Sequence, residues 1–361
     1  MSRSFRIVLS FFLCLPVFAW GQQIAEPASP VLVPRPAPKP ANPAALEGRI
    51  KLDVVVTDGA GKPVSGLDSQ DFTLLDNNKP IKTVSFHAFG GANANSGPPV
   101  EVILLLDTVN AEFRDVSFAR REVQSFLQEN GGHLAQPVSI FVLTDTGLRA
   151  QRQPSTDGNE LATELNQMDS VLRNNGVTTG GNGEIERYSS SIREISRITT
   201  FEERKPGRKL LLWIGPGWPL LDSVNFQTSF DSMKQSFDSI IELSTNLREA
   251  HIGVYSIAVG ESNANTLTYR GYLKGVKTFR QASPSNLSVK VLATQTGGRI
   301  LGPDNGLKAQ IDKCAQDATA FYTLSFDPSH ADHPDEYHDL KVQIGKPGLT
   351  AHTSTGYYNQ P

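Results

Sequence analysis

The chain has 361 residues, a formal net charge of -3, 20% charged residues and two cysteines. This slightly acidic balance argues against a nucleic-acid partner, because proteins that bind phosphate backbones carry clustered positive charge. Cys14 lies in an N-terminal apolar run, so a processed chain keeps only Cys314 and forms no internal disulfide. Stability must therefore come from a hydrophobic core, for which the length is ample.

The N-terminus has the pattern of a secretory signal peptide. Arg3 and Arg6 precede an apolar run at residues 7–18, which is too short to span a bilayer. Cleavage after Gly21 removes both arginines and no acidic residue, which moves the net charge from -3 to -5. We expect residues 1–21 to be cleaved and the mature protein to be secreted or periplasmic, without a membrane span.

Residues 22–48 are rich in proline and alanine, which predicts a semi-extended linker. Residues 49–89 then alternate apolar and polar side chains and predict an N-terminal β segment with a turn at Asn77 and Asn78. The sequence GGANANSGPP, residues 90–99, breaks regular structure and marks the end of this segment.

Residues 98–316 alternate between strands and helices. Apolar runs at 102–106, 138–144, 209–215 and 252–259 are each followed, directly or after a loop, by apolar residues at helical spacing. This order predicts an α/β fold, a mostly parallel sheet with helices on both faces. Ligands of such sheets bind at the carboxyl ends of the strands, where Asp107 lies.

Residues 317–361 return to short strands. Three strands here and three in residues 49–89 would each be marginal as an isolated sheet. We expect the two terminal β segments to pair in one β-sandwich, into which the α/β domain is inserted.

Several motifs resemble the von Willebrand factor A (vWA) domain, which is Rossmann-like. They are LLLD followed by a helix, RKLLLWIGPGWP, LREAHIGVYSIAVG and LATQTGGRIL. The flanking β segments resemble those of the vWA-related proteins of Acidobacteria, and the resemblance covers about residues 49–359. It implies a protein-binding or adhesion module with a metal-ion-dependent adhesion site, which in the wider family holds magnesium at the carboxyl ends of the strands.

The adhesion-site pattern is incomplete in this sequence. Asp107 matches the first aspartate of D-x-S-x-S, but Val109 and Ala111 occupy the two hydroxyl positions, and Pro216 replaces a later aspartate. Magnesium needs an octahedral set of oxygen ligands, so this loss predicts a degenerate site.

The remaining candidate metal ligands are Asp107, Asn110 and Thr178. We expect no cofactor, and only weak binding of any magnesium, because these residues offer few oxygens. Asp107 is expected instead to accept backbone N–H groups of the loop that follows it, or to cap the next helix.

Loops at the same edge of the sheet supply the predicted partner-binding residues, which are Thr179, Gly181, Asn182 and Trp218. Residues 180–184, GGNGE, lack the lysine of a phosphate-binding loop and predict a loop beside Asp107. Trp218 follows the third buried strand and is expected either to be an exposed interface anchor or to pack under the Thr178 loop.

Two other functions compete with a binding module for an unidentified protein. Residues 327–339 place His330, His333 and His338 among carboxylates, which would suit a metal-dependent hydrolase, although a solvated loop is the simpler interpretation. The third hypothesis is a structural spacer of the cell envelope. The sequence has neither H-E-x-x-H nor G-x-S-x-G, and Cys314 lies on a predicted amphipathic helix, so we expect no enzyme.

Overall fold

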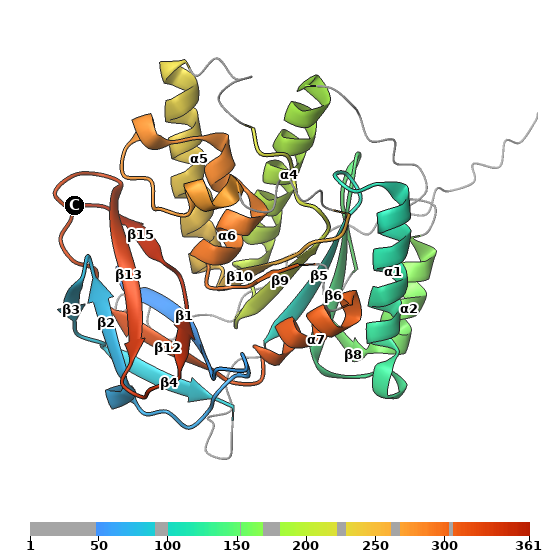
Figure 1. Cartoon of the computed structure of the whole chain (residues 1–361), viewed down its shortest axis with the longest axis horizontal. Coiled ribbons are helices and arrows are strands. Elements are labelled where there is room, and N and C mark those ends of the chain that lie inside the picture. The colour runs from blue at the N-terminus through green and yellow to red at the C-terminus, as the bar shows by residue number, and fades with distance from the viewer. Residues whose placement is uncertain are drawn as a thin grey trace, which may run out of the picture.

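The computed structural model describes residues 48–90, 100–151, 153–168, 181–221, 229–260, 268–302 and 306–361 (Figure 1). The predicted signal peptide, residues 22–47 of the linker, Thr178 and Thr179 lie outside these ranges. None of the helices in the described ranges combines the length and the apolar character that a membrane span requires.

A central sheet confirms the predicted α/β architecture. In the described ranges its strand order is β11-β10-β9-β5-β6-β7. The parallel strands are β5 (Glu101–Asp107), β6 (His133–Thr144), β9 (Lys209–Ile214), β10 (Ile252–Ile257) and β11 (Ile300–Leu301). An antiparallel extension of β6, which the apolar pattern does not predict, consists of β7 (Gly147–Ala150) and β8 (Ser155–Asp157).

Helices cover both faces of this sheet (Figure 1). One face packs against α1 (Phe113–Leu127), α2 (Gly158–Gln167) and α7 (Leu307–Gln316). The other face packs against α4 (Gly181–Glu202), α5 (Phe230–Glu249) and α6 (Val289–Gln295). Successive side chains of a strand point to opposite faces, so both must be apolar; Leu104 and Leu105 of β5 accordingly enter different cores.

The start of α4 corrects one prediction. Residues 181–184, expected to be part of a loop, form the first turn of this helix. Glycine is tolerated there, and Glu184 in that turn carries a charge that the positive end of the helix dipole favours. The helix is held in place further along, where Ile195 and Ile198 are fully buried against the sheet.

The terminal segments form the predicted β-sandwich. Its two sheets have the orders β14-β1-β12-β4 and β15-β13-β2-β3. The N-terminal segment supplies β1 (Ile50–Thr57), β2 (Phe72–Asp76), β3 (Lys79–Ile81) and β4 (Ser85–Phe89), and the C-terminal segment supplies β12 (Phe321–Phe326), β13 (Glu336–Ile344), β14 (Thr350–His352) and β15 (Gly356–Asn359).

Pairing between the two segments is extensive. β1 pairs with β12 and β2 pairs with β13, both antiparallel, and side chains of both sheets share one apolar core. The predicted turn between β2 and β3 is present, with Asn77 and Asn78 at φ of 47° and 63°. Such left-handed pairs suit a tight hairpin, and asparagine tolerates them.

Buried polar contacts join the sandwich to the α/β part. Arg299 donates to both carboxylate oxygens of Asp317 and to the backbone oxygen of Gly61 in the sandwich. On another side of this junction, the ring Nδ1 of His251 lies 2.9 Å from Oδ2 of Asp53 in β1. These contacts fix the α/β domain to the sandwich. The carboxyl ends of the parallel strands face away from the sandwich (Figure 1).

Candidate functional site

Asp107, at the carboxyl end of β5, is the centre of a buried hydrogen-bond cluster. Its Oδ1 accepts from the backbone N–H groups of Val109 at 3.2 Å and Asn110 at 3.0 Å. Its Oδ2 accepts from Nδ2 of Asn110 at 3.0 Å and from Nε1 of Trp213 at 2.9 Å. The expectation that Asp107 accepts N–H groups of the following loop is confirmed, whereas the N-cap of α1 is Glu112.

Burial dominates the protonation of Asp107. Asp107 is only 2% exposed, and the loss of water around its carboxyl group raises the pKa of that group. Hydrogen bonds from Asn110, Trp213 and Val109 act in the opposite direction, because they stabilise the charged form. The charged form of Asp107 is therefore stabilised by these N–H donors.

The described residues do not fit a magnesium site. Val109 and Ala111 are apolar and packed into the two cores, and Pro216 offers no side-chain oxygen. Asp107 already uses both oxygens as acceptors of N–H groups. Across the described ranges, no group of three or more His, Cys, Asp or Glu side chains is placed to hold a metal ion. The proposed ligand Thr178 lies outside these ranges, so the expectation of weak or absent magnesium binding stays a prediction.

Trp218 is buried, which excludes the exposed anchor and leaves the packed alternative. It is 4% exposed and packs edge to face against Trp213, with ring centroids 4.9 Å apart. The preceding Gly217 has φ of 74°, and a Cβ there would lie 2.4 Å from Cγ1 of Val289. This tight left-handed turn, which only glycine fits, folds the chain back and places Trp218 under the edge of the sheet.

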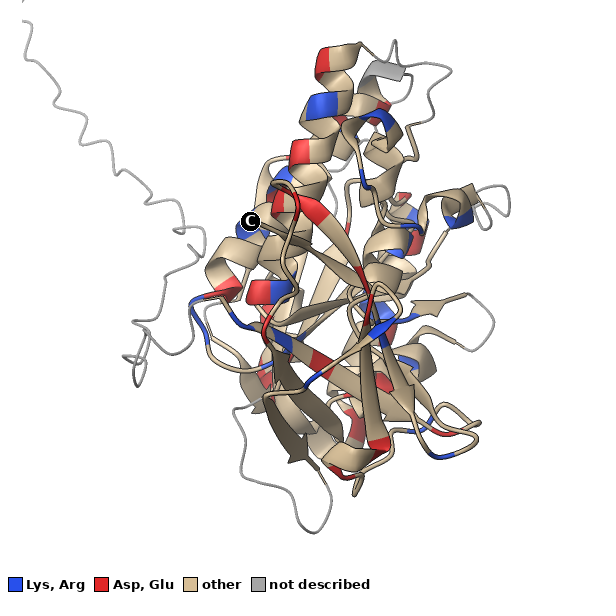
Figure 2. Cartoon of the chain, turned by 90° about the vertical axis from the view of Figure 1, so that its left-hand side faces the viewer, with Lys and Arg blue, Asp and Glu red and all other residues tan. Residues whose placement is uncertain are grey.

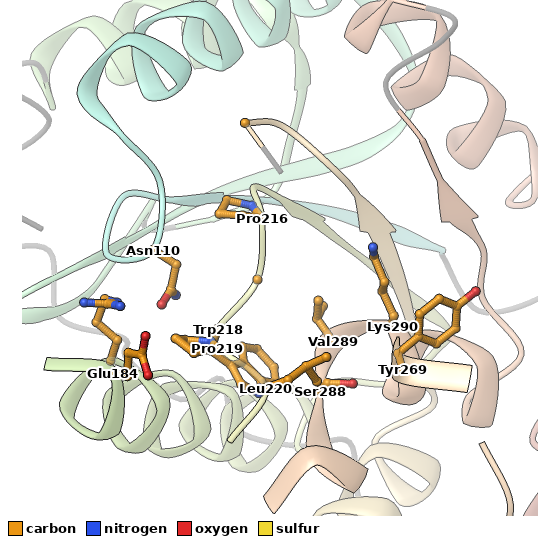
Figure 3. A pocket seen from close by; sticks show the side chains of 13 residues that line it. Asn110, Glu184, Pro216, Trp218, Pro219, Leu220, Tyr269, Ser288, Val289 and Lys290 are labelled. Atoms are coloured by element: carbon orange, nitrogen blue, oxygen red, sulfur yellow. The ribbon is translucent and has the colours of Figure 1, made fainter. Parts of the chain in front are cut away.

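A cavity of about 290 Å³ opens at this edge (Figure 3). Its wall comes from the strand exits, with Asn110 after β5, residues 216–220 after β9 and Gly260 after β10, and from residues 184, 187, 269 and 288–290. Figure 3 shows Asn110 and Glu184 on one side, Lys290 and Tyr269 on the opposite side, and Trp218 between them. The cavity lies where ligands of parallel sheets bind.

Three residues of the wall each carry a buried polar atom without a hydrogen-bond partner in the described part of the chain. These atoms are Oδ1 of Asn110, Nε1 of Trp218 and Oγ of Ser288. Buried polar groups are nearly always paired in folded proteins, because an unpaired group costs about 1–3 kcal/mol. All three atoms are shielded from solvent, so they lie behind the surface of the cavity.

Charged side chains complete the wall. Lys290 is only 6% exposed, and its Nζ lies 5.5 Å from the ring centroid of Tyr269. Arg187 adds a second positive charge and Glu184 an exposed negative one. Sequence reasoning missed Arg187, Tyr269 and Lys290, whereas Glu184 belongs to the segment predicted to lie beside Asp107. The available signal was a lysine among the apolar residues of VKVLA.

Exposed apolar side chains occur near the same edge. Phe113 and Phe230, the first residues of α1 and α5, are 57% and 59% exposed, and Ile185 near the start of α4 is 40% exposed. Helices α1, α4 and α5 begin on the side of the molecule where the parallel strands end (Figure 1), and these residues lie at or near the helix starts. We call Phe113, Ile185 and Phe230 the apolar rim.

The histidines of residues 327–339 are not brought together. His330 and His333 are exposed, whereas His338 is buried in the sandwich with its Nδ1 2.9 Å from Oδ1 of Asp76. Ser329 and Tyr357 donate to Oδ2 of the same aspartate. Asp76 and His338 therefore form a structural pair in the sandwich core.

No protein-family model matches the chain, and no curated protein matches it. Structures of vWA-domain proteins are similar at low identity. The human COPII-coat protein Sec24c superposes with a TM-score of 0.38 at 9% identity, over 76% of this chain and 46% of that one. The manganese-loaded TRAP protein of Plasmodium vivax gives 0.34 at 9% identity, over 75% and 97%. The pilus adhesin SpaC of Lactobacillus rhamnosus GG gives 0.34 at 10% identity, over 82% and 49%.

The chain thus spans about half the length of the Sec24c and SpaC chains. At these identities the similarity concerns the fold alone.

Proposed function

We propose that this protein is a secreted, non-enzymatic binding module that recognises another protein through the carboxyl edge of its central sheet. The observation that carries the proposal is the cavity at this edge, together with the apolar rim at the starts of three helices. The signal-peptide pattern of residues 1–21 supports secretion.

The apolar rim supports a protein partner. Aromatic side chains that stay more than half exposed leave apolar surface in water, and such residues at an edge commonly become buried in an interface. In the described ranges, five large apolar side chains are at least 39% exposed, and three of them, Phe113, Ile185 and Phe230, are the apolar rim.

The arrangement of the two parts leaves the carboxyl edge of the central sheet accessible to a partner. Acidic and basic residues are interspersed over the face that Figure 2 shows, so a large surface of one charge sign is not the basis of recognition on that face. The sandwich lies at the opposite end of the α/β domain from the carboxyl ends of its parallel strands, so it does not cover that edge (Figure 1).

The test compares two sets of variants of the mature chain. In the rim variant, Phe113, Ile185 and Phe230 are changed to serine; in the control, Phe118 and Val84, each 39% exposed but outside the rim, are changed to serine. A partner is first captured from the extracellular fraction by cross-linking and then produced separately, so that its affinity can be measured by calorimetry.

We expect the rim variant to lose at least about tenfold in affinity, or about 1.4 kcal/mol, while the control binds like the unchanged chain. Equal affinity of both variants would reject the carboxyl edge as the interface and leave the spacer hypothesis.

A further inference from the structure

We infer that residues 30–34 of this chain, PVLVP, dock as an additional β-strand on the free edge of β4 and close the open side of the sandwich. The inference concerns the sandwich and not the carboxyl edge, so it is independent of the proposed function. It comes from an apolar groove between the two sheets and from the place where residues 22–47, which lie outside the described ranges, join the sandwich.

The groove lies where each sheet of the sandwich has an end strand. In the described ranges β4 ends one sheet and β3 ends the other, and one edge of each pairs with no further strand. A groove of about 450 Å³ is lined by residues of β2, β3 and β4 and of the segments that precede β2 and β4. An unpaired strand edge beside an apolar groove is a template for an added strand.

The groove leaves one side of the sandwich core incompletely covered. Phe86 lies opposite the fully buried Leu324 in the pair of β4 and β12, so its side chain faces the inside of the sandwich. Val84, two residues earlier, also lines the groove and is 39% exposed. From the other sheet, Ile81 lies opposite Leu74 and is half-buried. A covering strand would remove this apolar surface from water.

The chain enters the sandwich beside this groove. β1 begins at Ile50, which pairs with Phe326 of β12, and the residue before it, Ser325, pairs with Ser85 at the start of β4. Residue 48 is therefore at the same end of the sheet as the start of β4, about two strand spacings or roughly 10 Å away. Residues 34–47 span roughly 40 Å when extended, which is enough for residues 30–34 to reach any part of β4.

Residues 30–34 have the pattern of an edge strand. In residues 22–47, only Val31, Leu32 and Val33 are three consecutive large apolar residues, and valine favours extended backbone. Successive residues of a strand turn their N–H groups to opposite edges. Pro30 and Pro34, which have no N–H group, then share the outer edge with Leu32, while Val31 and Val33 pair with β4. Prolines on the outer edge also discourage the pairing of another strand.

Hydrogen exchange tests the docking in the mature chain. In the serine variant, residues 31–33 are replaced by Val31→Ser, Leu32→Ser and Val33→Ser. We expect the amide groups of residues 84–89 to exchange about tenfold faster in this variant than in the unchanged chain, because the edge of β4 is then uncovered. Mass spectrometry of the exchanged chains measures the difference.

The control variant changes three other apolar residues of the same linker to serine, by Ile24→Ser, Ala41→Ser and Leu46→Ser. It should exchange like the unchanged chain, because its residues 30–34 are intact.

A peptide added in trans tests the proposed pairing. The labelled peptide SPVLVPRP, residues 29–36 with both ends blocked, should bind the serine variant at least about tenfold more tightly than the unchanged chain, in which the linked segment occupies the groove. N-methylation of Val31 or Val33 in the peptide should weaken binding about tenfold. N-methylation of Leu32 is the matched control, because its N–H group faces away from β4. Val84→Asp in the serine variant should weaken binding by a similar factor, since it places a charge in the groove.

Equal exchange of residues 84–89 in the unchanged chain and the serine variant would overturn the inference. So would equal peptide binding by these two chains, or equal losses on N-methylation of Leu32 and of the two valines. If the segment docks on a second copy instead, protection of β4 should rise with protein concentration and the unchanged chain should elute as a dimer. That outcome would reject docking within one chain.

Discussion

Trp213 and Asp107 connect the exits of two neighbouring strands: Nε1 of the buried indole donates a 2.9 Å hydrogen bond to Oδ2 of the buried carboxylate. The two side chains come from β9 and β5, which pair in parallel with Trp213 opposite Leu105. N–H donors from the loop complete the cluster. At this position, where the family resemblance implies a metal, the carboxylate is held by hydrogen bonds.

The first prediction concerns the contribution of this hydrogen bond. Trp213→Phe should lower the free energy of unfolding by about 1.5–3 kcal/mol more than Trp218→Phe, because a buried charged acceptor loses a donor. Trp218 is the matched control, since its ring packs against Trp213 but its Nε1 has no partner in the described ranges. Urea denaturation measures both values. Equal losses of unfolding free energy in the two variants would mean that the indole of Trp213 stabilises the fold by packing alone.

The second prediction concerns divalent cations. Calorimetric titration of the mature chain with magnesium, manganese or calcium should give no stoichiometric heat, because Asp107 lacks neighbouring oxygens and accepts N–H groups at both of its own. Asp107→Ala is the reference for non-specific heat. One equivalent of bound cation that disappears in this variant would show that a metal site exists after all.

The third prediction concerns the junction between the sandwich and the α/β part. Asp317 is 1% exposed and accepts from Arg299, while Tyr255 also donates to it at 3.0 Å. Asp317→Ala should lower the free energy of unfolding by about 3–5 kcal/mol, since it leaves a buried guanidinium group unpaired.

Asp339→Ala is the control for the junction. Asp339 lies 3.6 Å from Lys277 in an ion pair whose side chains are both more than half exposed. Its loss should cost under about 1 kcal/mol. Thermal unfolding of both variants gives the comparison, and similar losses would show that the buried network is not needed to hold the two parts together.

The fourth prediction concerns pH. Burial, with Glu101 as a further cause, raises the pKa of Glu202 from 4.5 to about 7. The folded protein therefore holds this proton more tightly than the unfolded chain does. The resulting stabilisation is complete below about pH 4.5 and is lost as the pH rises through about 7.

Glu202→Gln, which is neutral at every pH, should remove this dependence. The melting temperature of the unchanged chain relative to that of the variant should fall between pH 5 and pH 8. The neighbouring Glu203 is exposed, so Glu203→Gln is the control for the loss of a carboxylate in this segment. A constant difference for Glu202→Gln would show that Glu202 is already ionised at pH 5.

Much of the fold could be predicted from the residues. The apolar runs that became β5, β6, β9 and β10 are local patterns, and burial on both faces is visible in five consecutive apolar residues, 102–106. The short strands β7 and β8 escaped prediction, because their pairing with β6 rather than their own apolar pattern defines them.

The candidate site could be predicted only in its location. Asp107 marked the carboxyl edge, but Ser288 and Lys290 come from a segment about 180 residues later, and only the folded chain brings them to Asn110. Trp218 was placed on the correct edge with its exposure left open, because its burial depends on how Gly217 meets Val289.

The sequence by itself determined the alternation of the main strands and helices and the absence of side-chain oxygens at Val109, Ala111 and Pro216. These follow from side-chain chemistry and periodicity, which are local properties of the chain. Only the tertiary structure decided that the two ends pair in one sandwich, that Trp213 holds Asp107 and that Trp218 is buried. Hydrogen bonding between distant residues depends on positions within a few tenths of an ångström, and packing alone fixes those positions.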